Sequence, residues 1–150
     1  MGVAYHARHA RAGLPHAYHD SVTALAAHSD FLVVITPGGA LTRHLINAEV
    51  LQALGPKGIL VNVARGSVVD EAALIDALER GVIAGAGLDV FENEPRVPER
   101  LLALQRVVLT PHIGSATAAT RQAMADLAAA NLAAHFAGRA LPSPVPECQS

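Results

Sequence analysis

The chain has 150 residues, enough for one domain with a buried core, and 51% of them are hydrophobic, which indicates a globular fold and excludes a disordered chain. A net charge of −2 without a basic block argues against a nucleic-acid surface, and a single cysteine, Cys148, excludes an internal disulfide framework. No apolar run approaches the roughly 20 residues that span a bilayer, and no signal-peptide pattern is present, so we expect a cytoplasmic protein without a membrane segment.

Strands and helices are expected to alternate along the chain. Short apolar runs bounded by turn residues predict strands at 2–6, 31–35, 59–63, 82–88 and 107–109. Helical patterns with capping residues follow at 21–27, 48–54, 70–80 and 116–137. The run 31–35 is apolar throughout, which predicts burial on both faces. Residues 7–20 and 92–100 are polar and are interpreted as loops, so the chain is expected to pass from strand to strand directly through 89–106. This alternation predicts an α/β fold with a doubly wound, mostly parallel sheet.

Three polar residues follow strand-like runs. Arg65 comes just past the run 59–63, and Glu94 and His112 follow the two later runs. Because the carboxyl ends of parallel strands form the edge where ligands bind, we expect the three side chains to lie together. Histidine exchanges a proton near neutral pH, a carboxylate can hold its imidazole, and a guanidinium fork matches a substrate carboxylate. The set suits reduction of a 2-keto acid, with a hydride arriving on one face and a proton on the oxygen.

Other interpretations stay open at this point. An arginine such as Arg65 can also sit in a surface loop and pair with any nearby acid. The spacings His6-x-x-His9 and His16-x-x-His19 suit metal ligands, but no cysteine or carboxylate cluster completes a site, so no metal is predicted. Cys148 is disfavoured as a nucleophile because nothing activates a thiol in a proline-rich tail.

Three long motifs carry a family resemblance. They are Asn62-Val63-Ala64-Arg65-Gly66-Ser67-Val68-Val69-Asp70, Gly85-Ala86-Gly87-Leu88-Asp89-Val90-Phe91-Glu92-Asn93-Glu94-Pro95 and Leu109-Thr110-Pro111-His112-Ile113-Gly114-Ser115. In this order they resemble the signatures of the D-isomer-specific 2-hydroxyacid dehydrogenases, over about residues 2–142. The resemblance is strongest to the glyoxylate/hydroxypyruvate reductase branch, in which Thr36-Pro37-Gly38-Gly39 also has a counterpart.

The resemblance implies a role for each matching residue. Arg65 binds the substrate carboxylate and carbonyl, and His112 is the acid/base. Its partner is Glu94, directly before Pro95, rather than Glu92. Asp89 holds the nicotinamide carboxamide, and the cofactor is bordered by Thr36, Pro37, Val63, Ala64, Arg65, His112 and Ser115. The implied reaction is reduction of a small 2-keto acid, of the glyoxylate or hydroxypyruvate type, to the D-2-hydroxy acid. Which 2-keto acid is used is not fixed by these residues.

The loop after the first strand bears on the choice between NAD and NADP. NAD-specific sites place an acidic residue at the end of the second strand, against the ribose hydroxyls. In this chain Arg8 follows the strand 2–6, and the first acid is Asp20. Arg8 is therefore a candidate for the extra phosphate of NADP, with Arg11 a weaker one, and the alternative is a solvated basic loop. The sequence favours NADP, while NAD stays possible.

The chain also departs from the family. It contains no Gly-x-Gly-x-x-Gly turn, so the resemblance implies an incomplete Rossmann-like sheet without the N-terminal strand, glycine-rich turn and helix. We expect a partial dinucleotide-binding domain over 1–115, a helix over 116–138 that returns towards an absent substrate domain, and a proline-rich tail over 139–150. A homodimer is implied for the full-length family member. The alternative function is a catalytically silent remnant that acts as a binding or dimerisation module.

Overall fold

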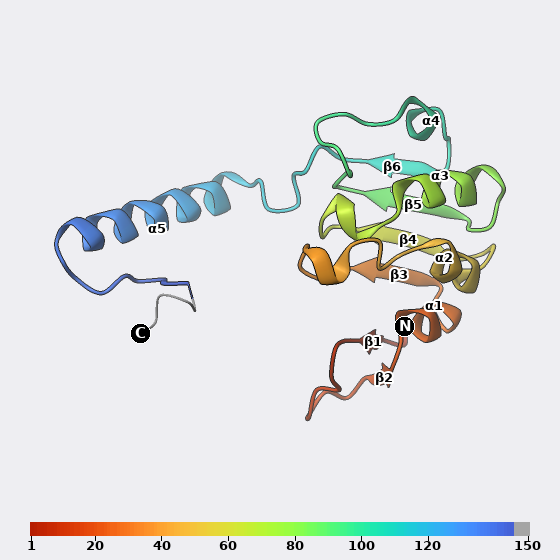
Figure 1. Cartoon of the computed structure of the whole chain (residues 1–150), viewed down its shortest axis with the longest axis horizontal. Coiled ribbons are helices and arrows are strands. Elements are labelled where there is room, and N and C mark those ends of the chain that lie inside the picture. The colour runs from red at the N-terminus through yellow and green to blue at the C-terminus, as the bar shows by residue number, and fades with distance from the viewer. Residues whose placement is uncertain (146–150) are drawn as a thin grey trace. The chain divides into compact units, whose positions relative to one another are not determined.

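The main sheet is parallel and takes its strands in chain order. The computed structural model describes residues 1–145. Figure 1 shows the four strands side by side, namely β3 (Phe31–Val34), β4 (Ile59–Asn62), β5 (Gly85–Leu88) and β6 (Val107–Leu109). Every neighbouring pair is parallel, and the register sets Leu60 beside both Leu32 and Ala86. The α/β fold with a parallel sheet predicted from the sequence is confirmed.

Helices between the strands supply the buried core. They are α1 (Val22–Ala27), α2 (Ala48–Leu54) and α3 (Glu71–Glu79), and each begins after a side-chain cap, at Ser21, Asn47 and Asp70 respectively. Leu51 of α2 and Leu74 of α3 are buried in the same cluster as Leu32 and Leu60 of the sheet. Each such leucine contributes roughly 1.5–3 kcal/mol on burial, so these helices fix the positions of the strands.

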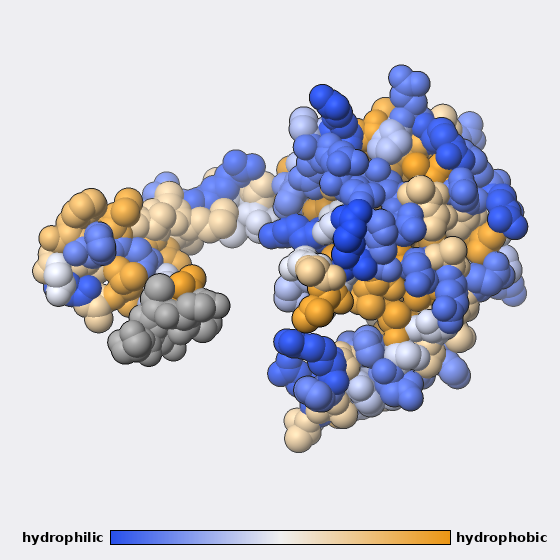
Figure 2. Space-filling view, in the orientation of Figure 1, coloured by the Kyte–Doolittle hydropathy of each residue, from blue (hydrophilic) through white to orange (hydrophobic). Residues whose placement is uncertain are grey.

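β3 is buried on one face only, so the prediction of burial on both faces is wrong. Leu32 and Val34 are at most 5% exposed, whereas Phe31 and Val33 are 58% and 52% exposed. The first pair belongs to the core shared with α2 and α3, and among residues 1–145 more than half of the surface of each residue of the second pair is uncovered. Figure 2 shows that hydrophobic side chains, in orange, lie among the polar ones on the face in view.

Two short elements interrupt segments that the sequence predicts as loops. β2 (Ala17–His19) pairs in parallel with β1 (Ala4–His6) in a separate two-stranded sheet. α4 (Glu99–Leu102) lies between β5 and β6, so the passage between these strands is not direct. β2 reads Ala-Tyr-His and contains no apolar run, and α4 begins inside the polar, proline-containing segment 92–100, which explains why the pattern missed both.

The chain from Ile113 onward forms a second compact unit. Its helix α5 (Ala118–Phe136) begins after Thr117, whose hydroxyl accepts a hydrogen bond from the Thr120 amide, which confirms the long helix predicted near 116–137. Its apolar side chains Met124, Leu127, Leu132 and Phe136 are exposed. None of the helices described is long and apolar enough to cross a membrane. Cys148 and the end of the predicted tail lie outside the described residues.

Two backbone segments at the carboxyl edge of the sheet lie in direct contact. Gly66 opens the short 3₁₀ helix η2 (Gly66–Val68) directly after Arg65. A Cβ atom on Gly66 would overlap main-chain atoms of Phe91 and Glu92. Only glycine therefore allows the segment that carries Arg65 to lie against the loop 91–94 that follows β5.

Replacing Gly66 by alanine should force these two backbones apart. We expect Gly66→Ala to lower the free energy of unfolding by roughly 1–3 kcal/mol, the range typical of overpacking, as measured by urea denaturation. Gly2→Ala is the matched control, because no atom lies within 4 Å of a Cβ at Gly2. Equal stability of both variants would contradict the close approach at Gly66.

Candidate functional site

A cavity of about 990 Å³ lies at the carboxyl edge of the main sheet. Its lining comes from the segments that follow all four strands, namely 35–39 after β3, 63–67 after β4, 91–94 after β5 and His112 after β6. In open α/β sheets this edge is where ligands bind. The strand order therefore gathers into one cavity residues that are far apart in the sequence.

Arg65 is held at the edge of the cavity by a buried amide. Asn62, 1% exposed, donates from Nδ2 to the Arg65 carbonyl (3.1 Å) and accepts from the Ala64 amide at Oδ1 (3.0 Å). The exposed guanidinium donates from Nη1 to the Ala64 carbonyl (2.6 Å). Among residues 1–145, no carboxylate oxygen lies within ion-pair distance of this guanidinium. Arg65 can therefore receive an anionic ligand.

His112 and Glu94 form a direct pair. Nδ1 of His112 lies 2.8 Å from Oε2 of Glu94, and the other oxygen, Oε1, accepts a hydrogen bond from the Phe91 amide (3.0 Å). His112 adopts a φ of 54°, in the left-handed region that a residue with a Cβ rarely enters. Such a conformation costs about 1–3 kcal/mol and persists only where the surroundings impose it, typically at functional sites.

The pair has a defined electrostatic state. The hydrogen bond from His112, followed by the one from the Phe91 amide and the nearby charge of Arg65, holds the pKa of Glu94 below its ordinary value. Glu94 is therefore a carboxylate at neutral pH, and it accepts the Nδ1 proton of His112. The second ring nitrogen, Nε2, is left for proton exchange with a ligand.

The structure brings together part of the predicted cofactor-binding set. Thr36, Pro37, Val63, Ala64, Arg65 and His112 line the cavity. Asp89 does not line it: this residue follows β5, is 7% exposed and accepts a hydrogen bond from the Thr110 hydroxyl (2.5 Å). Arg8 is exposed in the segment between β1 and β2, outside the cavity. Ser115 belongs to the second compact unit.

One histidine of the segments 6–9 and 16–19 contacts a backbone carbonyl. Nδ1 of His6 lies 3.0 Å from the His19 carbonyl, across the β1–β2 pair. Among the residues described, no group of three histidine, cysteine or acidic side chains could hold a metal ion.

Two residues at the site were missed by the sequence analysis. Asn62 is a polar residue inside the apolar run 59–63, and that contrast was the available signal. Glu92 lines the cavity and contacts Arg43 and His44, which lie more than 45 positions earlier, so no local pattern could reveal it.

Comparisons with known proteins point to one family. A family model described as D-isomer specific 2-hydroxyacid dehydrogenase, NAD binding domain, matches residues 1–114. A hydroxyphenylpyruvate reductase from Plectranthus scutellarioides is 52% identical over 95% of the chain and 46% of its own length. A glyoxylate/hydroxypyruvate reductase A from Arabidopsis thaliana is 50% identical over 94% of the chain and 45% of its own length.

A solved structure extends the likeness to three dimensions. It is the NADPH-dependent glyoxylate/hydroxypyruvate reductase of Sinorhizobium meliloti in complex with NADP and malonate. It matches with a TM-score of 0.94 and 55% identity, over 97% of this chain and 46% of that one. The chain thus spans about half the length of the relatives it matches.

The buried amide of Asn62 yields a stability prediction with a defined pH dependence. In Asn62→Asp, a carboxylate cannot donate to the Arg65 carbonyl and is buried, so we expect a loss of about 2–4 kcal/mol at pH 7. Burial raises the folded-state pKa of the new acid, so the deficit should shrink as the pH falls towards 5, where the protonated acid donates again. Urea denaturation of wild type and variant at pH 7 and at pH 5 measures this deficit. Exposed Asn93→Asp should show no such deficit, and a deficit that grows on acidification would contradict the role of Asn62.

The Glu94–His112 bond predicts an unusual titration. We expect the Glu94 carboxyl, followed by ¹³C NMR, to titrate with a pKa below the ordinary value of a glutamate, and this pKa to rise in His112→Asn. Asparagine is chosen because it tolerates positive φ. Because the folded-state pKa is lowered, the stabilisation is present above the unfolded-state pKa and is lost as the pH falls through the folded value. A Glu94 titration that does not move in His112→Asn would show that the bond does not form in solution.

Proposed function

The chain belongs to the family of D-isomer specific 2-hydroxyacid dehydrogenases, and from this premise we propose that it carries the acid/base pair and the carboxylate-binding arginine of an NADP-dependent 2-keto acid reductase. One observation carries the proposal. The bonded pair of His112 and Glu94 lines the same cavity as Arg65, whose guanidinium has no carboxylate partner in residues 1–145.

Arg65 accounts for recognition of the substrate class. Its planar guanidinium matches the two oxygens of a carboxylate, and in a 2-keto acid the carbonyl oxygen lies next to that carboxylate. The same positive charge draws electron density onto the carbonyl oxygen and makes the carbonyl carbon more electrophilic. A small 2-keto acid, of the glyoxylate or hydroxypyruvate type, is the proposed substrate, since similar proteins are named as reductases of these compounds.

His112 accounts for the proton. With Nδ1 bonded to Glu94, Nε2 of the imidazolium donates its proton to the carbonyl oxygen as that oxygen becomes an alkoxide, which yields the 2-hydroxy acid. The carboxylate of Glu94 bonds Nδ1 and thereby holds the ring in one orientation, with Nε2 towards the substrate. In the reverse direction the neutral imidazole accepts the proton from the hydroxyl group.

The lining fits a nicotinamide cofactor, which when bound supplies the hydride. Ile35 and Val63 are apolar, line the cavity and are 77% and 47% exposed, so a flat ring can cover them. Thr36, Pro37 and Ala64 would border the cofactor beside them, and Asp89 and Ser115 are proposed to contact it. Arg8 is proposed to bind the extra phosphate of NADP, because no acid lies between β1 and Asp20.

The proposed division of the chain follows from these roles. Residues 1–115 would form the dinucleotide-binding part, 116–138 a helix that runs towards a substrate domain, and 139–150 a tail. The exposed apolar residues of β3 and α5, such as Phe31, Val33, Leu132 and Phe136, favour a second candidate. In it, the chain is a catalytically silent module that binds the cofactor or dimerises.

An assay of NADPH oxidation with glyoxylate and with hydroxypyruvate tests the proposal. We expect turnover by the wild-type chain, and a fall in kcat of about 10²–10⁴-fold in His112→Asn, the range for loss of a general acid. Arg65→Gln should raise KM and lower kcat together, because it removes both carboxylate binding and polarisation. Arg80→Gln, an exposed arginine at the end of α3, should leave both constants unchanged.

Two results would contradict the reductase proposal. One is turnover by His112→Asn at the wild-type rate. The other is the absence of turnover by the wild-type chain with any small 2-keto acid. In the second case NADPH binding, followed by cofactor fluorescence, would support the silent module, and sedimentation would show whether the chain dimerises.

A further inference from the structure

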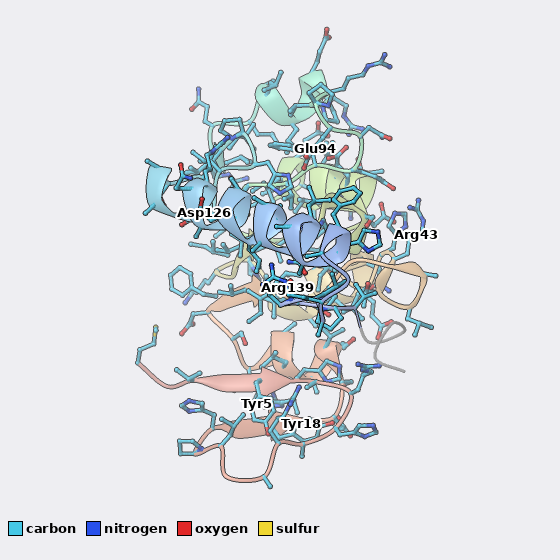
Figure 3. All side chains as sticks on the ribbon, turned by 90° about the vertical axis from the view of Figure 1, so that its left-hand side faces the viewer. Tyr5, Tyr18, Arg43, Glu94, Asp126 and Arg139 are labelled. Atoms are coloured by element: carbon cyan, nitrogen blue, oxygen red, sulfur yellow. The ribbon has the colours of Figure 1, made fainter. Side chains whose placement is uncertain are left out.

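Glu92, two residues before Glu94, ties the loop 91–94 to a segment about fifty positions earlier in the chain. Its Oε1 accepts a hydrogen bond from Nη2 of Arg43 (2.9 Å) and lies 3.0 Å from Nε2 of His44. The Glu92 side chain is 21% exposed. Arg43 and His44 directly follow the 3₁₀ helix η1 (Ala40–Thr42), which continues the cavity-lining turn 36–39. Figure 3 labels Arg43 and Glu94 and shows both as sticks on the ribbon.

The backbone of Glu92 is held as well. Its amide donates to Oε2 of Glu71 (3.2 Å), the first residue of α3. Glu71 is 9% exposed, and burial raises the pKa of its carboxyl. On the other side, Gly66 brings its own backbone against Phe91 and Glu92. The loop is therefore fixed by α3, by the segment after β4, and by Arg43 and His44.

His44 adopts a constrained conformation to make its contact. Its φ is 51°, in the left-handed region, and its amide donates to the Ser67 carbonyl (2.9 Å). Its imidazole lies between Glu92 and Asp70, with Nδ1 3.9 Å from an Asp70 carboxylate oxygen. A strained residue of this kind persists only when its surroundings impose the conformation. The segment after Arg65 and the loop before Glu94 are thus joined through one histidine.

A surface ion pair alone would be too weak to hold the loop. The Arg43 side chain is 57% exposed, and exposed pairs contribute about 0–1 kcal/mol. The half-buried contact with His44 and the backbone bond to Glu71 add to it, and all three act on the same residue. Such a network restricts the loop more than any single contact does.

We propose that Glu92, held by Arg43 and His44, is a positioning residue that fixes the loop 91–94 so that the carboxylate of Glu94 meets His112. Glu92 acts through Glu94 and does not touch the reacting atoms. An effect of Glu92 on catalysis rests on the proposed function. The position of the loop 91–94 does not, and it can be measured without turnover.

The first test uses the chain itself and needs no turnover. In Glu92→Ala, hydrogen exchange of the Phe91 amide, whose bond to Glu94 depends on the loop, should accelerate about tenfold, the order expected for one lost hydrogen bond. The Glu94 carboxyl, which faces His112 and Arg65, should titrate closer to its ordinary value by ¹³C NMR. Glu49→Ala, at an exposed position of α2, is the matched control and should change neither observable.

The conservative variant separates position from charge. Glu92→Gln keeps an oxygen that accepts from Arg43 and His44, so both observables should return close to wild type. If Glu92→Gln and Glu92→Ala changed both observables equally, the negative charge of Glu92 would be responsible for the effect and not its hydrogen bonds. That result would overturn the positioning role. Should Glu92→Ala fail to fold, Arg43→Ala removes one of the contacts of Glu92 and leaves Glu92 itself in place. It should change both observables in the same direction as Glu92→Ala, but by a smaller amount.

Steady-state kinetics then show whether the position of the loop affects catalysis. If the wild-type chain reduces 2-keto acids, Glu92→Ala should lower kcat about tenfold and change KM less than about twofold, because Arg65 is anchored separately by Asn62. If the wild-type chain shows no turnover, the proposed function fails while the exchange and titration data still decide the positioning claim. Unchanged exchange at Phe91 together with an unchanged Glu94 titration in Glu92→Ala would overturn that claim.

Discussion

The contact between the backbone at Gly66 and the backbone of Phe91 and Glu92 is the constraint on which the site depends. The parallel register brings the strand ends to one edge, but it does not bring the loops beyond them into contact. A residue without a Cβ allows that approach, and the Asn62 amide fixes the turn just before it. These contacts hold Arg65 next to the loop that carries Glu94. A site that polarises a carbonyl requires such fixed positions.

Strain and order are concentrated around this cavity. The two residues other than glycine with positive φ, among those described, are His44 and His112, and both hydrogen-bond a glutamate of the loop 91–94. Each such conformation is unfavourable by about 1–3 kcal/mol. Burial of the leucines of β3, β4, α2 and α3 in one core offsets this strain, at roughly 1.5–3 kcal/mol for each side chain. The core therefore sustains a site that its local sequence alone would not adopt.

The sequence predicted the parts of the molecule that leave a local pattern. The apolar runs placed β3, β4 and β6, capping residues placed α2 and α3, and the strand ends predicted that Arg65, Glu94 and His112 would share one cavity. Burial of β3 on both faces was wrong, because an apolar run does not show which neighbours cover it: Phe31 and Val33 are exposed. β2 and α4 were missed because β2 contains no apolar run and α4 begins inside a polar, proline-containing segment. The contacts of Glu92 with Arg43 and His44 join distant segments, so only the folded chain reveals them.

Arg65, Glu94 and His112 are proposed to form one site for a 2-keto acid. A crystal structure of the chain with NADP and oxamate, an unreactive mimic of a small 2-keto acid, tests it most directly. We expect both terminal nitrogens of Arg65 to hold the oxamate carboxylate. The adjacent carbonyl oxygen should lie within hydrogen-bond distance of Nε2 of His112, while Nδ1 stays bonded to Glu94. Oxamate bound away from Arg65, or a His112 ring turned from Glu94 when the ligand is present, would contradict it.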